Sequence, residues 1–248
     1  MDNILYNILY SLNDKLDKND VGSINFTLAQ YFIKNLREIP EANIYSVAEE
    51  CNVSRASIRR FAKSMGFDNF AHMKSMVKDH LSEVEVIPDK NYRELLTGDL
   101  IRIVNELDDR MNTHEIDVIC KRIKDSKKMY IFTSRTGMSN ARDFQIQLAS
   151  RGKLSYIITD NLKMLNDIAV KDYVMVLSVS GMFAESIEKY MSKVNCTKDL
   201  ITVNRIHDFE KTYSNTYYMS HLDHSKNPDI YRAYGLHYFL DIIQNHYK

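Results

Sequence analysis

The most restrictive pattern in this chain is a tight turn between two short helical segments at residues 44–63. The helices of such a helix-turn-helix cross steeply, so a small residue is needed where they touch and apolar residues where both face a third helix. With Ile44 as the first place of the motif, the ninth place is usually glycine and here is Asn52, a residue type that tolerates left-handed backbone. Counted from Ile44, the fifth place holds the small residue Ala48, and the apolar places hold Val47, Cys51, Val53, Ile58 and Phe61.

The second helix of this motif is predicted to present a basic face. Ser54 stands at its start as an N-cap. The whole chain is neutral, with 33 Lys+Arg against 33 Asp+Glu, so its net charge does not by itself favour binding to nucleic acid. Residues 54–80, by contrast, hold six Lys/Arg and two acids, the local footprint that DNA binding needs. The candidate DNA contacts are Ser54, Arg55, Ala56, Ser57, Arg59, Arg60 and Lys63.

Two other interpretations of this face stay open. Runs of charge are commonly solvated surface, so the helix need not touch a ligand. Arg60 adjoins Phe61, and an acid within the same domain is an alternative partner for its guanidinium.

The rest of the chain predicts a second domain of a different class. We expect an all-α bundle at residues 1–80, a linker at 81–97 and an α/β domain at 98–248. Short apolar runs alternate with amphipathic segments there, which favours a parallel sheet flanked by helices. The predicted strands are 129–133, 154–159, 173–178, 200–203 and, more weakly, 216–219.

Residues 44–70 resemble the N-terminal domain of RpiR (MurR/RpiR) transcriptional regulators. Typical of that family are the Ser54–Ser57 run, the Arg60-Phe61-Ala62 triplet and the ending from Lys63 to Phe70. The family joins this domain to a C-terminal sugar isomerase (SIS) domain, a parallel sheet flanked by helices. The resemblance therefore implies operator DNA and a phosphorylated sugar as partners, and it extends over nearly the whole chain.

Two segments that follow predicted strands are candidate effector loops, because doubly wound sheets bind ligands at the carboxyl ends of their strands. Hydroxyls and free N–H groups at helix starts suit anions. The segment 178–183 resembles the SIS phosphate loop, Ser-x-Ser-Gly-x-Thr. The resemblance implies the following effector residues: Ser134, Arg135 and Ser139 from the first loop, and Ser178, Ser180, Gly181 and Glu185 from the second.

The chain departs from the family pattern in both loops. Phe183 replaces the last threonine of the phosphate loop, and Thr133 and Arg135 stand where the first loop usually carries glycine. Arg135 is either a phosphate partner or an obstruction of the pocket. Glu185 is the one acid placed to serve an isomerase as a base, although a glutamate in a first helical turn is normally a partner of the helix dipole.

Other classes of protein fit less well. Cys51, Cys120 and Cys196 form neither a disulfide framework nor a metal motif, and the histidines lack a ligand set. We expect no cofactor and no metal, no signal peptide and no membrane span. The expected protein is a cytoplasmic, non-enzymatic DNA-binding regulator that forms a homodimer or higher homo-oligomer. The alternatives are a sugar-phosphate isomerase and a ligand-sensing protein without DNA binding.

Overall fold

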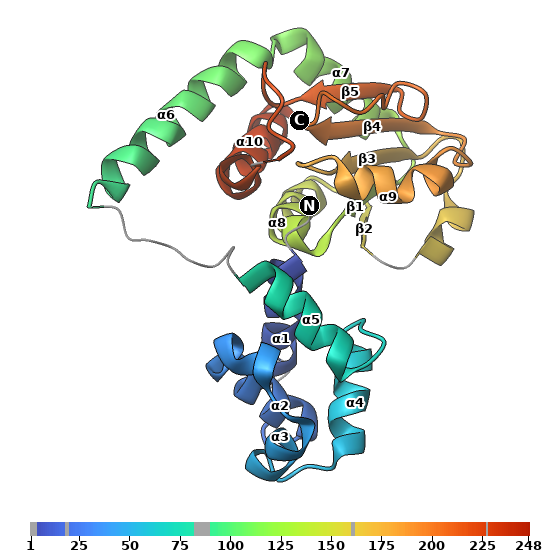
Figure 1. Cartoon of the computed structure of the whole chain (residues 1–248). Coiled ribbons are helices and arrows are strands. Elements are labelled where there is room, and N and C mark those ends of the chain that lie inside the picture. Colours follow the sequence, from blue (N-terminus) through green and yellow to red (C-terminus); the bar gives the residue numbers. More distant parts are fainter. Residues whose placement is uncertain (1–3, 18–19, 82–89, 160–161, 227) are drawn as a thin grey trace. The chain divides into compact units, whose positions relative to one another are not determined.

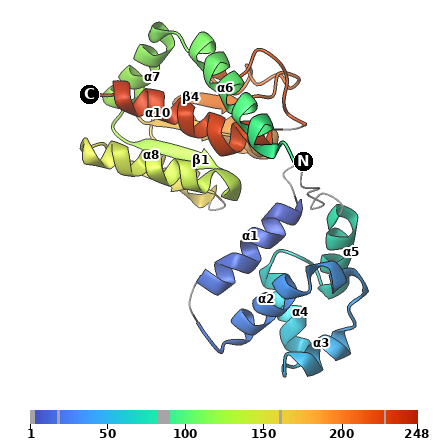
Figure 2. The same cartoon turned by 90° about the vertical axis from the view of Figure 1, so that its left-hand side faces the viewer.

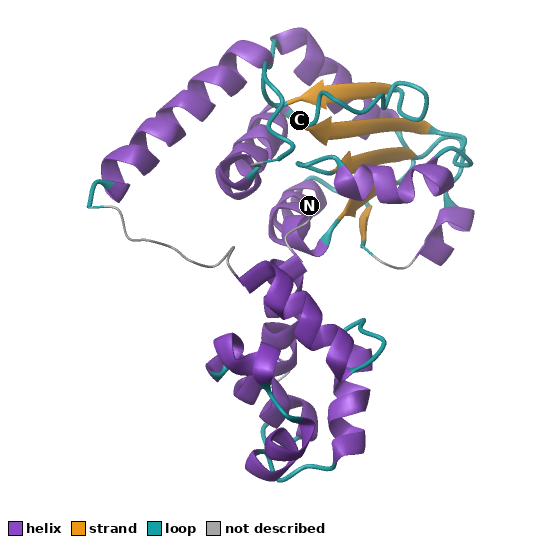
Figure 3. Cartoon of the chain, in the orientation of Figure 1, coloured by secondary structure: helices purple, strands orange, loops and turns teal. Residues whose placement is uncertain are grey.

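The chain divides into two compact units, residues 2–88 and 89–248. The computed structural model describes residues 4–17, 20–81, 90–159, 162–226 and 228–248. Figure 3 distinguishes the classes of secondary structure: the described residues of the first unit form helices and loops, and the described strands all lie in the second unit. The predicted fold class, an all-α bundle followed by an α/β domain, is confirmed.

The first unit is a helical bundle around one apolar core. Its rings of Phe32, Phe61 and Phe70 lie together, with the Phe32 centroid 5.7 Å from Phe61 and 5.9 Å from Phe70. Because these rings come from three helices, the core joins segments that are distant in sequence (Figure 1). The elements are α1 (Ile4–Asp17), α2 (Ile24–Lys34), a 3₁₀ helix (Leu36–Glu41), α3 (Ile44–Glu50), α4 (Arg55–Ser64) and α5 (Phe70–His80).

The second unit is built on a five-stranded parallel sheet with strand order β2-β1-β3-β4-β5. The chain starts in β1, adds β2 on one side and then crosses to β3 on the other. The connections therefore reverse direction between β1 and β3, which is the position where doubly wound sheets form ligand sites. The strands are β1 (Met129–Thr133), β2 (Ser155–Ile158), β3 (Tyr173–Leu177), β4 (Thr197–Thr202) and β5 (Asn215–Tyr218).

Helices cover both faces of this sheet, because alternate strand residues point to opposite sides. Met129 and Ile131 of β1 pack with one set of helices, and Tyr130 and Phe132 pack with α9 on the other face. Figure 2 shows α8 and α10 running beside each other on the first face. That face carries α6 (Tyr92–Arg110), α7 (Thr113–Asp125), α8 (Met138–Ser150) and α10 (Leu236–His246), and the other carries α9 (Met182–Met191).

A buried ion pair lies near the amino-terminal edge of the sheet. Asp199 of β4 has a fully buried side chain, and both of its oxygens accept from Nη1 of Arg122. The Tyr173 hydroxyl donates to the same carboxylate over 2.7 Å. A buried charge is tolerated here because its acceptors are satisfied by a cation and a hydroxyl.

The first helix of the second unit begins earlier than the sequence analysis predicts. We expected a linker through residue 97, but α6 begins at Tyr92, so residues 92–97 are helical. Their apolar side chains are exposed, with Leu95 at 57%, and they therefore lack the one-sided burial pattern that marks a helix in sequence. The expected linker residues 82–89 lie outside the described residues.

Two features are absent from the described part of the chain. No helix there is long and apolar enough to cross a membrane. Nor do the described residues bring together three or more His, Cys, Asp or Glu side chains that could hold a metal ion.

Candidate functional site

Helices α3 and α4 form the helix-turn-helix that the sequence predicts. Asn52 has a φ of +50°, the left-handed turn conformation expected at the ninth place. Ser54 adopts extended backbone, and its hydroxyl accepts from the Ser57 N–H over 3.1 Å, so it caps α4 as predicted. Val47, Ile58 and Phe61 are almost completely buried. The motif therefore rests on the packing that its sequence pattern indicates.

The outward face of α4 is basic. Arg55, Arg59, Arg60 and Lys63 are all exposed, as are Ser54 and Ala56. Within the described ranges, none of these four cations forms an ion pair with an acid. The alternative in which an acid of the same domain neutralises Arg60 therefore finds no support among the described residues.

Ser57 differs from the expectation. Its side chain is 5% exposed, and its hydroxyl lies 2.9 Å from Ser54 Oγ and accepts from Arg60 Nη2 over 3.3 Å. Ser57 faces inward because it completes the cap of α4, and its contact with DNA stays a prediction. Its contact with Arg60 restrains one of the outward cations instead.

The remaining cations of the segment 54–80 are used within the unit. Lys74 Nζ donates to the carbonyl of Ala42 over 2.7 Å, and Lys78 Nζ lies 3.8 Å from the Glu41 carboxylate. Both fasten α5 to the 3₁₀ helix and the residue that follows it. The positive surplus that the sequence assigned to the whole segment is thus concentrated on α4.

In the second unit, the two candidate effector loops begin side by side. Thr133, the last residue of β1, pairs in register with Leu177, the last residue of β3. The loops 134–137 and 178–181 therefore leave the sheet at adjacent positions, at the point where the strand connections reverse.

The hydroxyls of the second loop point inward. Ser178 is 3% exposed and its Oγ accepts from the Ala184 N–H over 3.0 Å, which caps α9, while Ser180 is 5% exposed. Gly181 has a φ of +87°, a conformation that L-residues with a side chain rarely adopt. The expectation that Ser178 and Ser180 contact a phosphate stays a prediction, since in this conformation neither is open to solvent.

The first loop is compact and turns over a buried hydroxyl. Ser134 Oγ lies 2.7 Å from Thr136 Oγ1, and Ser139 and Arg135 are exposed. A Cβ added at Gly137 would lie 2.2 Å from Thr133 Oγ1, so a larger residue there would force the Thr133 side chain to move. Thr133, where the family usually has glycine, therefore fills space below the loop and does not project into it.

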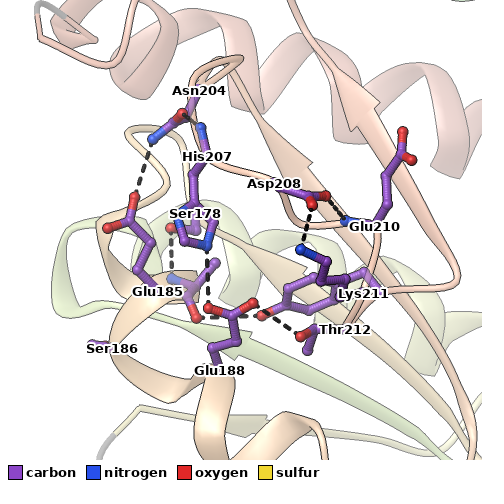
Figure 4. A network of polar contacts seen from close by, with 12 residues as sticks. Ser178, Glu185, Ser186, Glu188, Asn204, His207, Asp208, Glu210, Lys211 and Thr212 are labelled. Atoms are coloured by element: carbon purple, nitrogen blue, oxygen red, sulfur yellow. Dashed lines mark hydrogen bonds and ion pairs between the residues drawn. The ribbon is translucent and has the colours of Figure 1, made fainter.

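The sequence-based reasoning missed Asn204, which joins the second loop to the segment after β4 (Figure 4). Its Nδ2 donates to the Ser180 carbonyl over 3.0 Å and to Glu185 Oε1 over 3.2 Å. Its Oδ1 accepts from the N–H groups of Ile206 and His207. One side chain thus holds two loops together and fixes the carboxylate of Glu185.

Comparison with known proteins identifies the family of the helix-turn-helix domain. Residues 4–84 match the model of the helix-turn-helix domain of the rpiR family. An uncharacterised helix-turn-helix transcriptional regulator of Clostridium perfringens is 25% identical over 76% of this chain and 75% of its own length. The regulator GlvR of Bacillus subtilis is 24% identical over 70% of this chain and 65% of its own length. The first unit of this chain therefore carries a helix-turn-helix domain of the rpiR family.

Solved structures share the fold of this chain. NanR of Vibrio vulnificus, complexed with ManNAc-6P, has a TM-score of 0.54 at 12% identity and covers 97% of this chain and 90% of NanR. The sugar isomerase domain of an RpiR transcription factor from Sphaerobacter thermophilus has a TM-score of 0.52 at 10% identity, over 64% of this chain and 90% of that domain. The α/β unit therefore has the SIS fold that the sequence predicts.

In the SIS unit, α6 is anchored to the carboxyl edge of the sheet. Glu106 of α6 accepts from the Ser220 hydroxyl over 2.5 Å, from the His221 N–H over 2.8 Å and from the Tyr231 hydroxyl over 2.5 Å. Burial acts to raise the pKa of the Glu106 carboxyl, but these hydrogen bonds outweigh it and hold the pKa below the usual value.

A π-helical turn connects the hydrogen bonds of Glu106 to the helix that follows the first effector loop. Tyr231 lies in the π-helical segment Tyr231–Gly235, which leads directly into α10. The carbonyl of Arg232 accepts from Nδ2 of Asn140 in α8 over 3.3 Å. The anchor of α6 is thus connected by direct contacts to the helix that follows the first loop.

Proposed function

We propose that this chain binds operator DNA through α4 and that a phosphorylated sugar or related metabolite, bound at the loops after β1 and β3, changes the affinity for that operator. The observation that carries the DNA-binding part is the outward row Arg55, Arg59, Arg60 and Lys63, which has no acid partner among the described residues of an RpiR-family motif. Arginine can read guanine edges in the major groove and hold phosphates.

The effector part rests on the position of the loops. Ser134, Arg135 and Ser139 lie on the first loop and the start of α8, beside the Ser178–Gly181 loop. The fold is shared with NanR, whose structure holds ManNAc-6P. Binding at this edge would alter operator affinity only if the metabolite prefers one arrangement of the chain. A coupling of about 1–3 kcal/mol, or 5- to 150-fold in affinity, is typical.

Homodimerisation is part of the proposal. Side chains along α6 that are apolar and exposed in the single chain, such as Leu95 at 57% and Ile101 at 58%, support a surface that a second copy buries. A dimer would place two copies of α4 in successive major grooves, about 34 Å apart. We propose no catalytic role: the acid beside the second loop, Glu185, is held by Asn204, and a base for isomerisation has no second supporting observation.

An unbiased selection of DNA sequences with the purified chain tests the proposal. The selected DNA is expected to contain two half-sites about one helical turn apart. The variant Arg55→Ala/Arg59→Ala is expected to lose operator retention, whereas Lys78→Ala, which removes a cation of the same unit outside this row, is expected to retain it. Equal operator retention by both variants would contradict the assignment of α4 as the DNA-contacting helix.

The same operator then tests the effector. Addition of hexose and N-acetylhexosamine phosphates is expected to shift the operator Kd by 5- to 150-fold for the cognate metabolite. Binding of a sugar phosphate without any shift in operator Kd would remove the regulatory part, and turnover of such a phosphate would favour the isomerase alternative.

A further inference from the structure

A tyrosine outside the recognition helix contacts its first residue. The Arg55 guanidinium lies over the ring of Tyr45, with its central carbon 4.6 Å from the ring centroid. Tyr45 belongs to the first turn of α3, and Arg55 opens α4. The contact therefore joins the two helices of the motif through their outward side chains.

The packing of the unit does not explain this tyrosine. Its side chain is 63% exposed, and Tyr45 is not among the residues that form or line the core. Its backbone is fixed because the side chain of Asn43, the N-cap of α3, accepts from the Tyr45 N–H over 2.9 Å. An exposed ring on a fixed backbone is a stable surface for the guanidinium.

Arg55 is the cation for which such a surface matters most. In docked helix-turn-helix proteins, residues at the start of the second helix reach base edges, while the first helix crosses the sugar-phosphate backbone. Recognition of guanine by arginine is bidentate, so the plane of the guanidinium must be correctly oriented. A long side chain that is free in solution loses rotamer entropy when it is ordered on a base.

The other arginines of the row differ from Arg55 in their contacts. Arg60 is restrained on its own helix by the Ser57 hydroxyl, at 3.3 Å. The described residues provide no cation–π partner for Arg59. Only Arg55 of the described row has an aromatic face that restrains its guanidinium plane and still leaves its N–H groups available as donors.

We propose that Tyr45 is a positioning residue for DNA recognition: it holds the Arg55 guanidinium in the orientation that reads a guanine, and so contributes to sequence discrimination through Arg55. This inference rests on the proposed DNA-binding function. It predicts that the ring matters and that the hydroxyl does not, because the contact is with the ring face.

The test compares Tyr45→Leu with Tyr45→Phe on the selected operator and on an operator with one substituted base pair. Tyr45→Leu is expected to reduce discrimination at a single base pair by about two- to fivefold, the size of an exposed cation–π contact. Tyr45→Phe is expected to retain it. The salt dependence of binding is expected to be unchanged in both, because no phosphate contact is removed. Equal melting temperatures would verify the fold.

A double-mutant cycle separates positioning from direct contact. In the Arg55→Ala background, Tyr45→Leu is expected to cause no further loss of discrimination. A further loss there, full discrimination by Tyr45→Leu, or a loss with Tyr45→Phe would each overturn this proposal while leaving the proposed function intact. If the unsubstituted chain binds no DNA, the proposed function and this inference both fail.

Discussion

Replacing Gly181 with alanine is expected to destabilise the SIS unit much more than the same change at a comparable glycine. A Cβ at position 181 would lie 2.5 Å from Nδ2 and 2.7 Å from Cβ of Asn204. Because the Cβ of Asn204 is fixed to its backbone, rotation of the amide does not relieve the overlap. The loop after β3 or the segment after β4 must therefore move.

The magnitude of this effect has two parts. A side chain in left-handed backbone costs roughly 1–2 kcal/mol, and overpacking adds about 1–3 kcal/mol. Gly181→Ala is therefore expected to lower the free energy of unfolding by about 2–5 kcal/mol. Gly152 is the matched control, since its φ is +75° and nothing lies within 4 Å of an added Cβ. Gly152→Ala should cost only the backbone part, about 1–2 kcal/mol.

Urea denaturation of the full chain, followed by circular dichroism, measures both variants against the parent chain. Adding Asn204→Gly to Gly181→Ala is expected to cost less than the sum of the single changes, because it removes the Cβ that the alanine meets. Equal destabilisation by Gly181→Ala and Gly152→Ala would refute the argument that Asn204 closes this loop.

Two further predictions concern polar groups of the SIS unit. Because hydrogen bonds hold the folded-state pKa of Glu106 below its usual value, its ionised form contributes stability that is present above the unfolded pKa and lost as pH falls through the folded pKa. Glu106→Gln is thus expected to be less stable than the parent at pH 7, with a gap that narrows below about pH 4 in urea denaturation; a constant gap would contradict this. Arg122→Met leaves the buried Asp199 carboxylate without its cation. Calorimetry should therefore report a decrease of about 3–5 kcal/mol in the free energy of unfolding. A much smaller decrease would mean that the hydrogen bond from Tyr173 is enough to stabilise the buried carboxylate.

Local rules predicted the helix-turn-helix in detail. The burial of Val47, Ile58 and Phe61, the left-handed Asn52 and the cap at Ser54 depend on neighbours within one motif, and all are confirmed. The inward position of Ser57 was missed because a serine beside a capping serine can either face solvent or complete the cap.

Features that depend on distant partners were less predictable. Strand β4 begins at Thr197, before the predicted start at Leu200. The prediction began too late because Asp199 is polar and so does not look like a buried strand residue. Asp199 is buried only through its pairing with Arg122. Asn204 was missed for the same reason, since its role comes from the approach of Gly181 across the sheet edge. No spacing rule in the sequence joins either pair.

The anchoring of α6 makes this helix a lever. Ile103 and Leu107 are buried and Glu106 is hydrogen-bonded, whereas the helix is exposed near its start at Tyr92. At 1.5 Å per residue, that start lies roughly 20 Å from the anchor along the helix axis. A tilt of about 6° at Glu106 would then displace it by roughly 2 Å relative to the sheet. A shift at the carboxyl edge too small to break a hydrogen bond would thus be magnified at the end of α6 that joins the helix-turn-helix unit in sequence.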